Sequence, residues 1–367
     1  MGTFLFSPGK NGNVPISCPG SVCAKKAYNR RSMLKRAAFV PALVLLLAAF
    51  SCGQSRDAGG GTLQDPAAPK SIKSPVPEFD ARSAYDFVKK QVEFGPRVPG
   101  TPAHAACAEW FVKTLKQWTP DVVVQSFQAK AFDGTILNGK NIIASFNAGA
   151  DDRILLCAHW DSRPYADHDP DPANRYKPVL GANDGASGVG VLLEIARMLS
   201  LQKAAAGVDI VLFDLEDYGE HRDWRGKASS DSWCLGSQYW SRNPHRPGYK
   251  ARYGILLDMV GASDAVFPRD GTSMYFAPAL TKKVWETARG LGLSKYFLDR
   301  ESDPLIDDHL YVNQIARIPT VDIIHYDADR GAFAGSWHTV GDTLEKIDAN
   351  TLMAVGRTLL ALIYQGK

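Results

Sequence analysis

The residues best suited to chemistry in this chain are carboxylates and imidazoles that follow its apolar segments. Several carboxylates brought together repel one another unless a cation or a proton lies between them. Imidazole nitrogen and carboxylate oxygen are also ligands that zinc takes in proteins, with three protein ligands and one open position in a catalytic site. The set therefore predicts a centre that holds a cation. Its members, in chain order, are His159, Asp184, Glu216, Asp217, Asp258 and His338.

These residues do not form a local metal motif. The helix-borne pattern His-Glu-x-x-His is absent from the sequence. A long Asp- and Pro-rich stretch separates His159 from Asp184, and His338 lies far along the chain. The ligands would come from separate segments, so the signal lies in the whole set and not in its spacing.

The segments that carry these residues alternate between strand-like and helical patterns. Strands that are apolar throughout and alternate with helices indicate a mostly parallel sheet buried on both faces. In such a sheet the site lies at the carboxyl ends of the strands, where we expect the set to meet. The strand-like runs are 121–128, 140–146, 153–159, 208–215, 254–260 and 318–326. The helical patterns are 80–91, 103–118, a segment that begins within 181–188 and ends near 200, 234–241, 280–290 and 349–365.

The charge of the chain is unevenly distributed. The 367 residues carry a formal net charge of +3, but residues 1–52 contain seven basic residues and no acidic one. The remaining 35 basic and 39 acidic residues give the rest of the chain a net charge of −4. Nucleic-acid binding, which needs a basic surface, therefore has no support in the composition.

The basic N-terminal region has the pattern of an export signal. In residues 30–52 a positive segment precedes an apolar run and a small-residue boundary. The run is short for a membrane span, and Pro41 interrupts it. Cys52 follows directly and resembles the lipidated cysteine of bacterial lipoproteins; simple secretion is the alternative. Met33 is a plausible true start.

The same region sets the expected domain organisation. We predict a leader over residues 1–52, a flexible linker rich in Gly, Ser and Pro over 53–78, and one catalytic domain over 79–367. Lipidation of Cys52 would anchor an exported protein to a bacterial membrane, facing the periplasm.

Three cysteines belong to the body of the chain, and they show no CxxC spacing. We expect Cys107, Cys157 and Cys234 to be buried thiols, with at most one disulfide.

Among the histidines outside the set, we expect His104 to be solvated and His309 to pack in the core. Asp184 could also cap the helix that follows it, since Asp is favoured at that position.

The set resembles a known family. The order is His-x-Asp at 159–161, Asn-Asp-Gly-Ala-Ser-Gly at 183–188, an acidic pair, Asp in Leu-Leu-Asp-Met, and a late His. It is similar to that of the co-catalytic zinc exopeptidases, a family that comprises zinc aminopeptidases and glutaminyl-peptide cyclotransferases. The resemblance covers residues 80–365. It implies a three-layer α/β/α fold with a central mixed, mostly parallel sheet.

Four motifs resemble the cyclotransferase branch of that family: HWDS at 159–162, LLDMVGASDAVFP at 256–268, DDH at 307–309 and Trp-His-Thr at 337–339. The resemblance implies an enzyme that converts the N-terminal Gln of peptides or proteins to pyroglutamate with release of ammonia.

The resemblance also implies a role for individual residues. One Zn²⁺ would bind to Asp184, Asp217 and His338. The general acid/base would be Glu216, the transferring amide would be stabilised by Asp308, and Trp337 would line the substrate pocket. Position 217 departs from the animal cyclases, which have Glu there, so the metal or its loop must shift slightly. Trp233 lies in the polar stretch after the acidic pair and is a further candidate for the pocket wall.

Two alternatives remain at this point. In the aminopeptidase branch Asp184 bridges two zinc ions, and His159 and Asp258 complete the second site; both residues are present here, so a dizinc aminopeptidase is the second hypothesis. A metal-free binding domain on the same scaffold is the third. The intact Glu216 and the complete ligand set argue against it.

Overall fold

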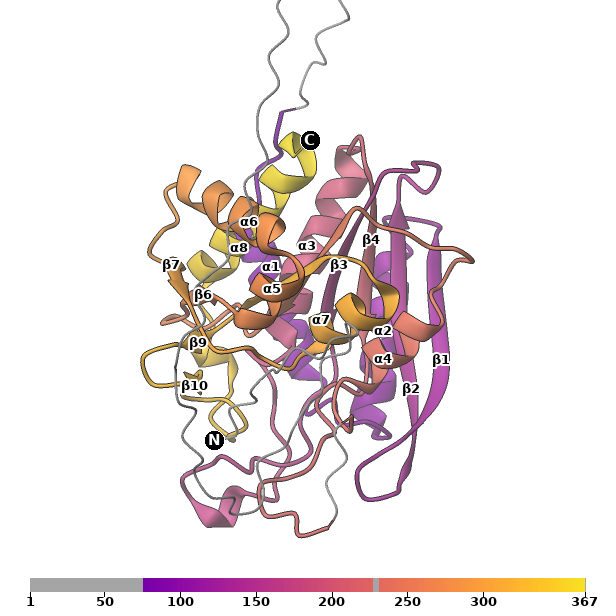
Figure 1. Ribbon diagram of the computed structural model, residues 1–367. Coiled ribbons are helices and arrows are strands. Elements are labelled where there is room, and N and C mark those ends of the chain that lie inside the picture. Colours follow the sequence, from indigo (N-terminus) through magenta and orange to yellow (C-terminus); the bar gives the residue numbers. More distant parts are fainter. Residues whose placement is uncertain (1–74, 227–230, 367) are drawn as a thin grey trace, which may run out of the picture. The chain divides into compact units, whose positions relative to one another are not determined.

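The computed structural model describes residues 75–226 and 231–366. Its centre is a six-stranded sheet in the order β1-β2-β4-β3-β5-β8 (Figure 1). The hairpin of β1 and β2 forms one edge, and β2 also pairs antiparallel with β4. The pairs β4–β3, β3–β5 and β5–β8 are parallel. The strands are β1 (Val122–Lys130), β2 (Ile136–Phe146), β3 (Arg153–His159), β4 (Gly207–Phe213), β5 (Tyr253–Asp258) and β8 (Thr320–Ile324).

The inner strands are buried on both faces because helices cover both sides. Every residue of β3 and β4 is buried. Along β3 the side chains alternate, so that Leu156 packs into one apolar cluster and Leu155 into another on the opposite face. The mixed, mostly parallel sheet and the three layers predicted above are confirmed.

The first face is covered by long helices. α1 (Ala81–Glu93), α3 (Ala186–Leu201) and α8 (Ala349–Gln365) pack against one another, and Figure 1 shows them side by side. α2 (Pro102–Leu115) and α6 (Pro278–Gly290) contribute to the same apolar cluster. The opposite face carries shorter elements: α4 (Leu235–Arg242), α7 (Asp308–Tyr311) and the helical turn Val312–Ala316.

Several short elements escaped the sequence patterns. β6 (Phe267–Arg269) and β7 (Phe297–Glu301) form a separate parallel pair, and β9 (Tyr326–Asp327) pairs with β10 (Ala332–Phe333). α5 (Gly271–Phe276) precedes α6. Three-residue helical turns occur at Pro172–Asn174 and Leu344–Lys346. Segments this short contain too few residues to show a periodicity.

The start of α3 differs from the expectation for Asp184. Gly185 stands at the N-cap, and within the described residues no side chain caps this helix. The N-cap prediction for Asp184 is therefore wrong. Its carboxylate points instead toward His159, with Oδ1 3.0 Å from Nε2.

The described residues test the prediction for the body cysteines and show whether one of their helices could span a membrane. Cys107, Cys157 and Cys234 are buried and unpaired, as predicted. Within residues 75–226 and 231–366, no helix combines the length and apolar character that a membrane span requires. The predicted leader and Cys52 lie outside the described residues.

Candidate metal centre

The residues predicted to bind a cation converge at one edge of the sheet. His159 ends β3 and Asp258 ends β5, while the Glu216-Asp217 pair follows β4. The remaining two members of the set come from the turn before α3 and from the loop before α8. The fold brings them together because the carboxyl ends of parallel strands share one edge.

Three of them form a group with the composition of a zinc site. The Nε2 atom of His338 lies 3.1 Å from Asp217 Oδ1 and 3.6 Å from Asp184 Oδ2. Both carboxylate oxygens are buried, and neither has a hydrogen-bond partner among the described residues. Buried oxygens without a partner are costly unless something satisfies them. One imidazole nitrogen and two carboxylate oxygens fit zinc.

The environment of His338 favours metal binding. Burial lowers the pKa of its ring well below the usual range, and the nearby charge of Arg163 acts in the same direction. The ring is therefore neutral, which is the form that ligates a metal. The other ring nitrogen, Nδ1, lies 3.7 Å from a carboxylate oxygen of Asp167. This distance is longer than a hydrogen bond, and Nδ1 has no hydrogen-bond partner among the described residues.

Arg163 contacts two of the carboxylates at this group. Its guanidinium binds Asp167 through two hydrogen bonds of 2.9 Å each and lies 3.7 Å from Asp217 Oδ1. It is buried and also donates to the backbone carbonyl of Asp217. Sequence reasoning missed Arg163, because an arginine four residues after a strand shows no signal of its buried partners.

Two further carboxylates hold the turns that carry the site. Asp161 accepts hydrogen bonds from the backbone N–H groups of Glu216 and Asp217, each at 3.1 Å. Asp342 accepts in the same way from Asn183 at 2.8 Å and from Asp184 at 3.0 Å. Asp342 was not predicted; its place four residues after His338 was the only available signal.

A second possible ligand group shares Asp184. His159 Nε2 lies 3.0 Å from Asp184 Oδ1 and 3.2 Å from Asp258 Oδ1. Burial raises the pKa of Asp258 to about 7, with the negative charge of Asp184 acting in the same direction. Burial lowers the pKa of His159, but contacts with Asp161 and the two carboxylates outweigh it and raise the pKa well above its usual value. This group therefore has the geometry of a hydrogen-bonded imidazolium as well as that of a ligand set.

Glu216 stands beside both groups. Its side chain is 13% exposed, and Oε2 lies 3.9 Å from His159 Nδ1. Burial raises its pKa well above the usual value; the charge of His159 opposes this, while those of Asp217, Asp307 and Asp308 reinforce it. Repulsion from the other carboxylates is therefore secondary to burial as a cause of this raised pKa.

Asp308 is wholly buried close to this edge. Burial and the adjacent Asp307 raise its pKa well above the usual value. His309 is buried in the core, as expected, but it has carboxylates as close neighbours. Its Nε2 lies 3.5 Å from Asp270 and its Nδ1 3.7 Å from Asp322, so it lies between two buried carboxylates.

His104 is also placed differently from the prediction. It is buried, its Nε2 lies 2.9 Å from an oxygen of Asp214, and its ring stacks on Trp160 at 4.3 Å. The expectation that it is solvated is wrong, because its partner is 110 residues away in sequence.

Two aromatic rings flank the proposed ligand His338. Trp337 stacks on its ring with a centroid distance of 3.8 Å. Trp233 lies parallel to it at 6.0 Å, and the guanidinium of Arg163 lies over the Trp233 ring at 4.5 Å. Both tryptophans proposed for the pocket wall therefore lie at the metal group.

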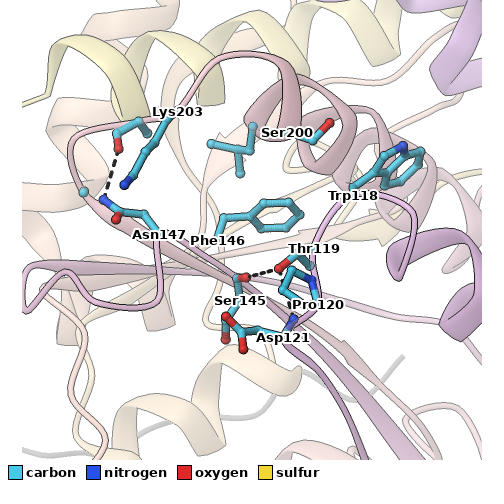
Figure 2. Close-up of a pocket in the computed structure, with 12 residues that line it drawn as sticks. Trp118, Thr119, Pro120, Asp121, Ser145, Phe146, Asn147, Ser200 and Lys203 are labelled. Carbon is cyan, nitrogen blue, oxygen red and sulfur yellow. Dashed lines mark hydrogen bonds between the residues drawn. The ribbon is translucent and has the colours of Figure 1, made fainter.

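A cavity elsewhere in the fold carries none of this chemistry. It has a volume of about 310 Å³ and is lined by residues near the ends of β2 and α3, several of which are drawn in Figure 2. The end of β2 pairs with the start of β4, so the cavity lies at the opposite edge of the sheet from the metal group. Polar groups around it bond to one another: Thr119 donates to the carbonyl of Ser145 and Asn147 to that of Ala204. None of the predicted site residues lines it.

Comparison with known proteins places this arrangement in a family. The model of peptidase family M28 matches residues 141–363. The chain belongs to peptidase family M28. The matched segment contains His159 and all the other members of the predicted set, through His338.

Within family M28 the chain is similar to solved bacterial structures. A glutaminyl cyclase of Bacteroides thetaiotaomicron is 52% identical, with a TM-score of 0.78 over 80% of this chain and 100% of that one. A leucine aminopeptidase precursor from Bacteroides thetaiotaomicron is 51% identical, with the same TM-score over 80% of this chain and 99% of that one. The glutaminyl-peptide cyclotransferase of Drosophila melanogaster is 31% identical over 47% of this M28 chain, a match that spans 46% of the fly protein.

Proposed function

We propose that this chain is a zinc-dependent glutaminyl-peptide cyclotransferase, which converts the N-terminal Gln of peptides or proteins to pyroglutamate and releases ammonia. The observation that carries the proposal is the group of Asp184, Asp217 and His338 with Glu216 beside it. It occurs in a chain that matches a bacterial glutaminyl cyclase along that protein's whole length.

The reaction is intramolecular, and this reduces what the protein must supply. The α-amine of the substrate Gln attacks its own γ-amide carbon, the ring C–N bond forms, and the bond to the amide nitrogen breaks. Because both reacting groups belong to one residue, the pocket needs only to select the compact conformer. Zinc held by Asp184, Asp217 and His338 would polarise the γ-carbonyl.

Glu216 moves the proton that the reaction requires. Its carboxylate takes one proton from the attacking amine and returns it to the leaving nitrogen, which departs as ammonia. Its raised pKa suits both halves of this transfer, since a general acid/base works best near its own pKa. The partial exposure of its side chain gives a substrate access to it.

Asp308 and the two tryptophans complete the proposed pocket. A carboxyl whose pKa is raised can stay protonated and donate a hydrogen bond to the amide that is being transferred. Trp337 and Trp233 would provide apolar walls beside His338 and limit the access of water, which would compete with cyclisation.

We propose one zinc ion per chain. Asp184 would then serve the metal through Oδ2, while its Oδ1 accepts from His159. His159 and Asp258 would act as a hydrogen-bonded support for that ligand and not as a second metal site.

The second candidate is a dizinc aminopeptidase that hydrolyses N-terminal residues. The His159–Asp184–Asp258 group favours it, because its ligand atoms lie close enough together for a second ion. The similarity to a leucine aminopeptidase precursor points the same way.

A lipid anchor belongs to the proposal as well. The pattern of residues 30–52 supports export, and Cys52 would carry the lipid, leaving the catalytic domain on a linker at a bacterial membrane, facing the periplasm. Peptide or protein N-termini in that compartment would be the substrates.

A paired substrate assay tests the function. We expect protein beginning at residue 53 to release ammonia from Gln-peptides and to leave otherwise identical Leu-peptides intact. Release of free Leu, or of free Gln, would contradict the cyclotransferase and support the aminopeptidase. Zinc analysis of the same preparation should give one equivalent; two equivalents would contradict the single-metal proposal.

A further inference from the structure

The proposed acid/base Glu216 is held at three points, and Cys234 supplies two of them. The backbone N–H of Glu216 donates to Asp161, as described above. Its carbonyl accepts from the backbone N–H of Cys234 at 2.9 Å. Its carboxylate oxygen Oε1 lies 3.2 Å from the Cys234 sulfur, in the geometry of a hydrogen bond from the thiol.

The backbone at Cys234 is shaped for this contact. Cys234 stands at the N-cap of α4 in the left-handed region, with φ 56° and ψ 34°. Leu215, on the opposing segment, is also left-handed, with φ 59°, and its carbonyl accepts from Leu235 N at 3.0 Å. Such conformations are unfavourable for residues other than glycine and persist where the surroundings enforce them. Here they bring the thiol against the carboxylate.

The buried thiol of Cys234 is suited to donate a hydrogen bond because it stays protonated. The side chain of Cys234 is wholly buried. Burial, together with the charge of Glu216, raises the pKa of the thiol well above its usual value, so it keeps its proton. It can therefore donate to a carboxylate without competing for the proton that Glu216 transfers.

The contact also distinguishes the two oxygens of Glu216. Oε1 faces the thiol, while Oε2 faces His159 Nδ1 at 3.9 Å, beyond hydrogen-bond distance. Asp307, whose Oδ2 is buried without a hydrogen-bond partner among the described residues, lies with the thiol and Glu216 in one group of atoms within 4.8 Å. A second carboxylate therefore lies close to the contact between the thiol and Glu216.

We propose that Cys234 is a positioning residue for the reaction: its S–H group holds Oε1 of Glu216 and leaves Oε2 to take the proton from the substrate amine and return it to the leaving nitrogen. This inference rests on the proposed function and adds to it a residue that binds neither metal nor substrate. The thiol acts only through Glu216.

Substitutions at Cys234 test the proposal. Cys234→Ala removes the donor but keeps the backbone contact, and we expect kcat for a Gln-peptide to fall about fivefold, the scale of a weak donor to a charged acceptor. KM and zinc content should stay unchanged. Cys234→Ser, which restores a donor, should recover most of the loss. The matched control is Cys107→Ala, which removes a buried thiol in α2 and should leave kcat unchanged.

A double-mutant cycle separates positioning from general damage. Glu216→Asp shortens the acid and moves its carboxylate away from the thiol. The loss of kcat caused by Cys234→Ala should therefore be much smaller in the Glu216→Asp background than in the wild type. An unchanged kcat in Cys234→Ala would overturn the inference, and so would equal losses in the alanine and serine variants. If the alanine variant fails to fold, Cys234→Gly takes its place in the cycle, because glycine suits the left-handed backbone at this position and also lacks a donor. Wild-type protein that releases no ammonia would overturn the proposed function itself, a different result from active wild type that the substitution leaves unaffected.

Discussion

The position of Glu216 after β4 determines the environment of its carboxylate. Glu216 follows an all-buried strand, so the carboxylate enters a region that desolvates it and raises its pKa. A second carboxylate, Asp217, follows at once and points toward His338 instead. Two adjacent acids thus face different partners, one suited to proton transfer and the other to metal binding.

The first prediction concerns Glu216 itself. In Glu216→Gln the amide cannot take a proton from the amine, so kcat should fall by about a hundredfold to ten-thousandfold, the usual contribution of general acid/base catalysis. Zinc content, measured by elemental analysis, should not change, because the proposed metal ligands are intact. The exposed Glu109 on α2 provides the control, since Glu109→Gln should leave turnover as it is. Turnover near the wild-type rate in Glu216→Gln would rule out the assigned role.

At this scale the sequence was informative where a residue's role depends on its own segment. Asp217 and His159 could be predicted because each follows an apolar strand. Asp342 and His104 could not, because what they do depends on partners far away in the chain: Asn183 for the first and Asp214 for the second. Single-sequence reasoning has no access to such pairings.

The element that most directly controls the metal group is the turn before α3. This turn has no side-chain cap of its own within the described residues, and Asp342 binds its N–H groups from across the fold. Burial and the negative charge of Asp184 raise the pKa of Asp342 to about 7. The orientation of Asp184 therefore depends on a carboxylate that is not a ligand.

Loss of Asp342 should weaken zinc binding. In Asp342→Ala two backbone N–H groups lose their acceptor, and we expect zinc affinity to fall about tenfold to a hundredfold, as for other residues that support metal ligands. Competition with a chelator would measure it. Asp348→Ala is the comparison: it removes the N-cap of α8 and should cost about 1 kcal/mol of stability while zinc affinity stays the same. Equal zinc affinity in Asp342→Ala and wild type would contradict this view of the turn.

The elements themselves were largely predictable. The six strands of the main sheet and the long helices show runs or periodicities of adequate length, and α8 occupies the predicted residues 349–365. The short pair β6–β7 and α7 were not predictable, since their few residues are set by packing and not by pattern. α7 matters most among them because it begins at Asp308, and only the DDH motif pointed to that position.

At the scale of the whole molecule, the negative charge gathered at one edge of the sheet links stability to the metal. Burial, and after it repulsion from neighbouring carboxylates, raises the pKa values of the acids in the two ligand groups and around Asp308. A cation bound there stabilises the folded state, whereas the unfolded chain offers no assembled site.

Removal of zinc should therefore lower the melting temperature. A ligand that binds only the folded state at about 100 times its Kd contributes about 3 kcal/mol. Calorimetry before and after treatment with a chelator should show the lower melting temperature, and stoichiometric zinc should reverse the change. Magnesium, which prefers an octahedral shell of oxygen ligands, should not restore the melting temperature. Identical melting temperatures with and without zinc would show that the acids are neutralised by protons alone.

The net charge of +3 over the whole chain hides this local balance, because the basic excess lies in residues 1–52. The catalytic domain is organised around a carboxylate cluster, two imidazoles and a proposed dication. We expect this centre to close a ring and to cleave no peptide bond. Mass spectrometry of a single Gln-peptide incubated with the zinc-loaded protein distinguishes the two reactions. We predict a product lighter by one ammonia with every residue retained; a product shortened by its N-terminal Gln would show that the protein is an aminopeptidase instead.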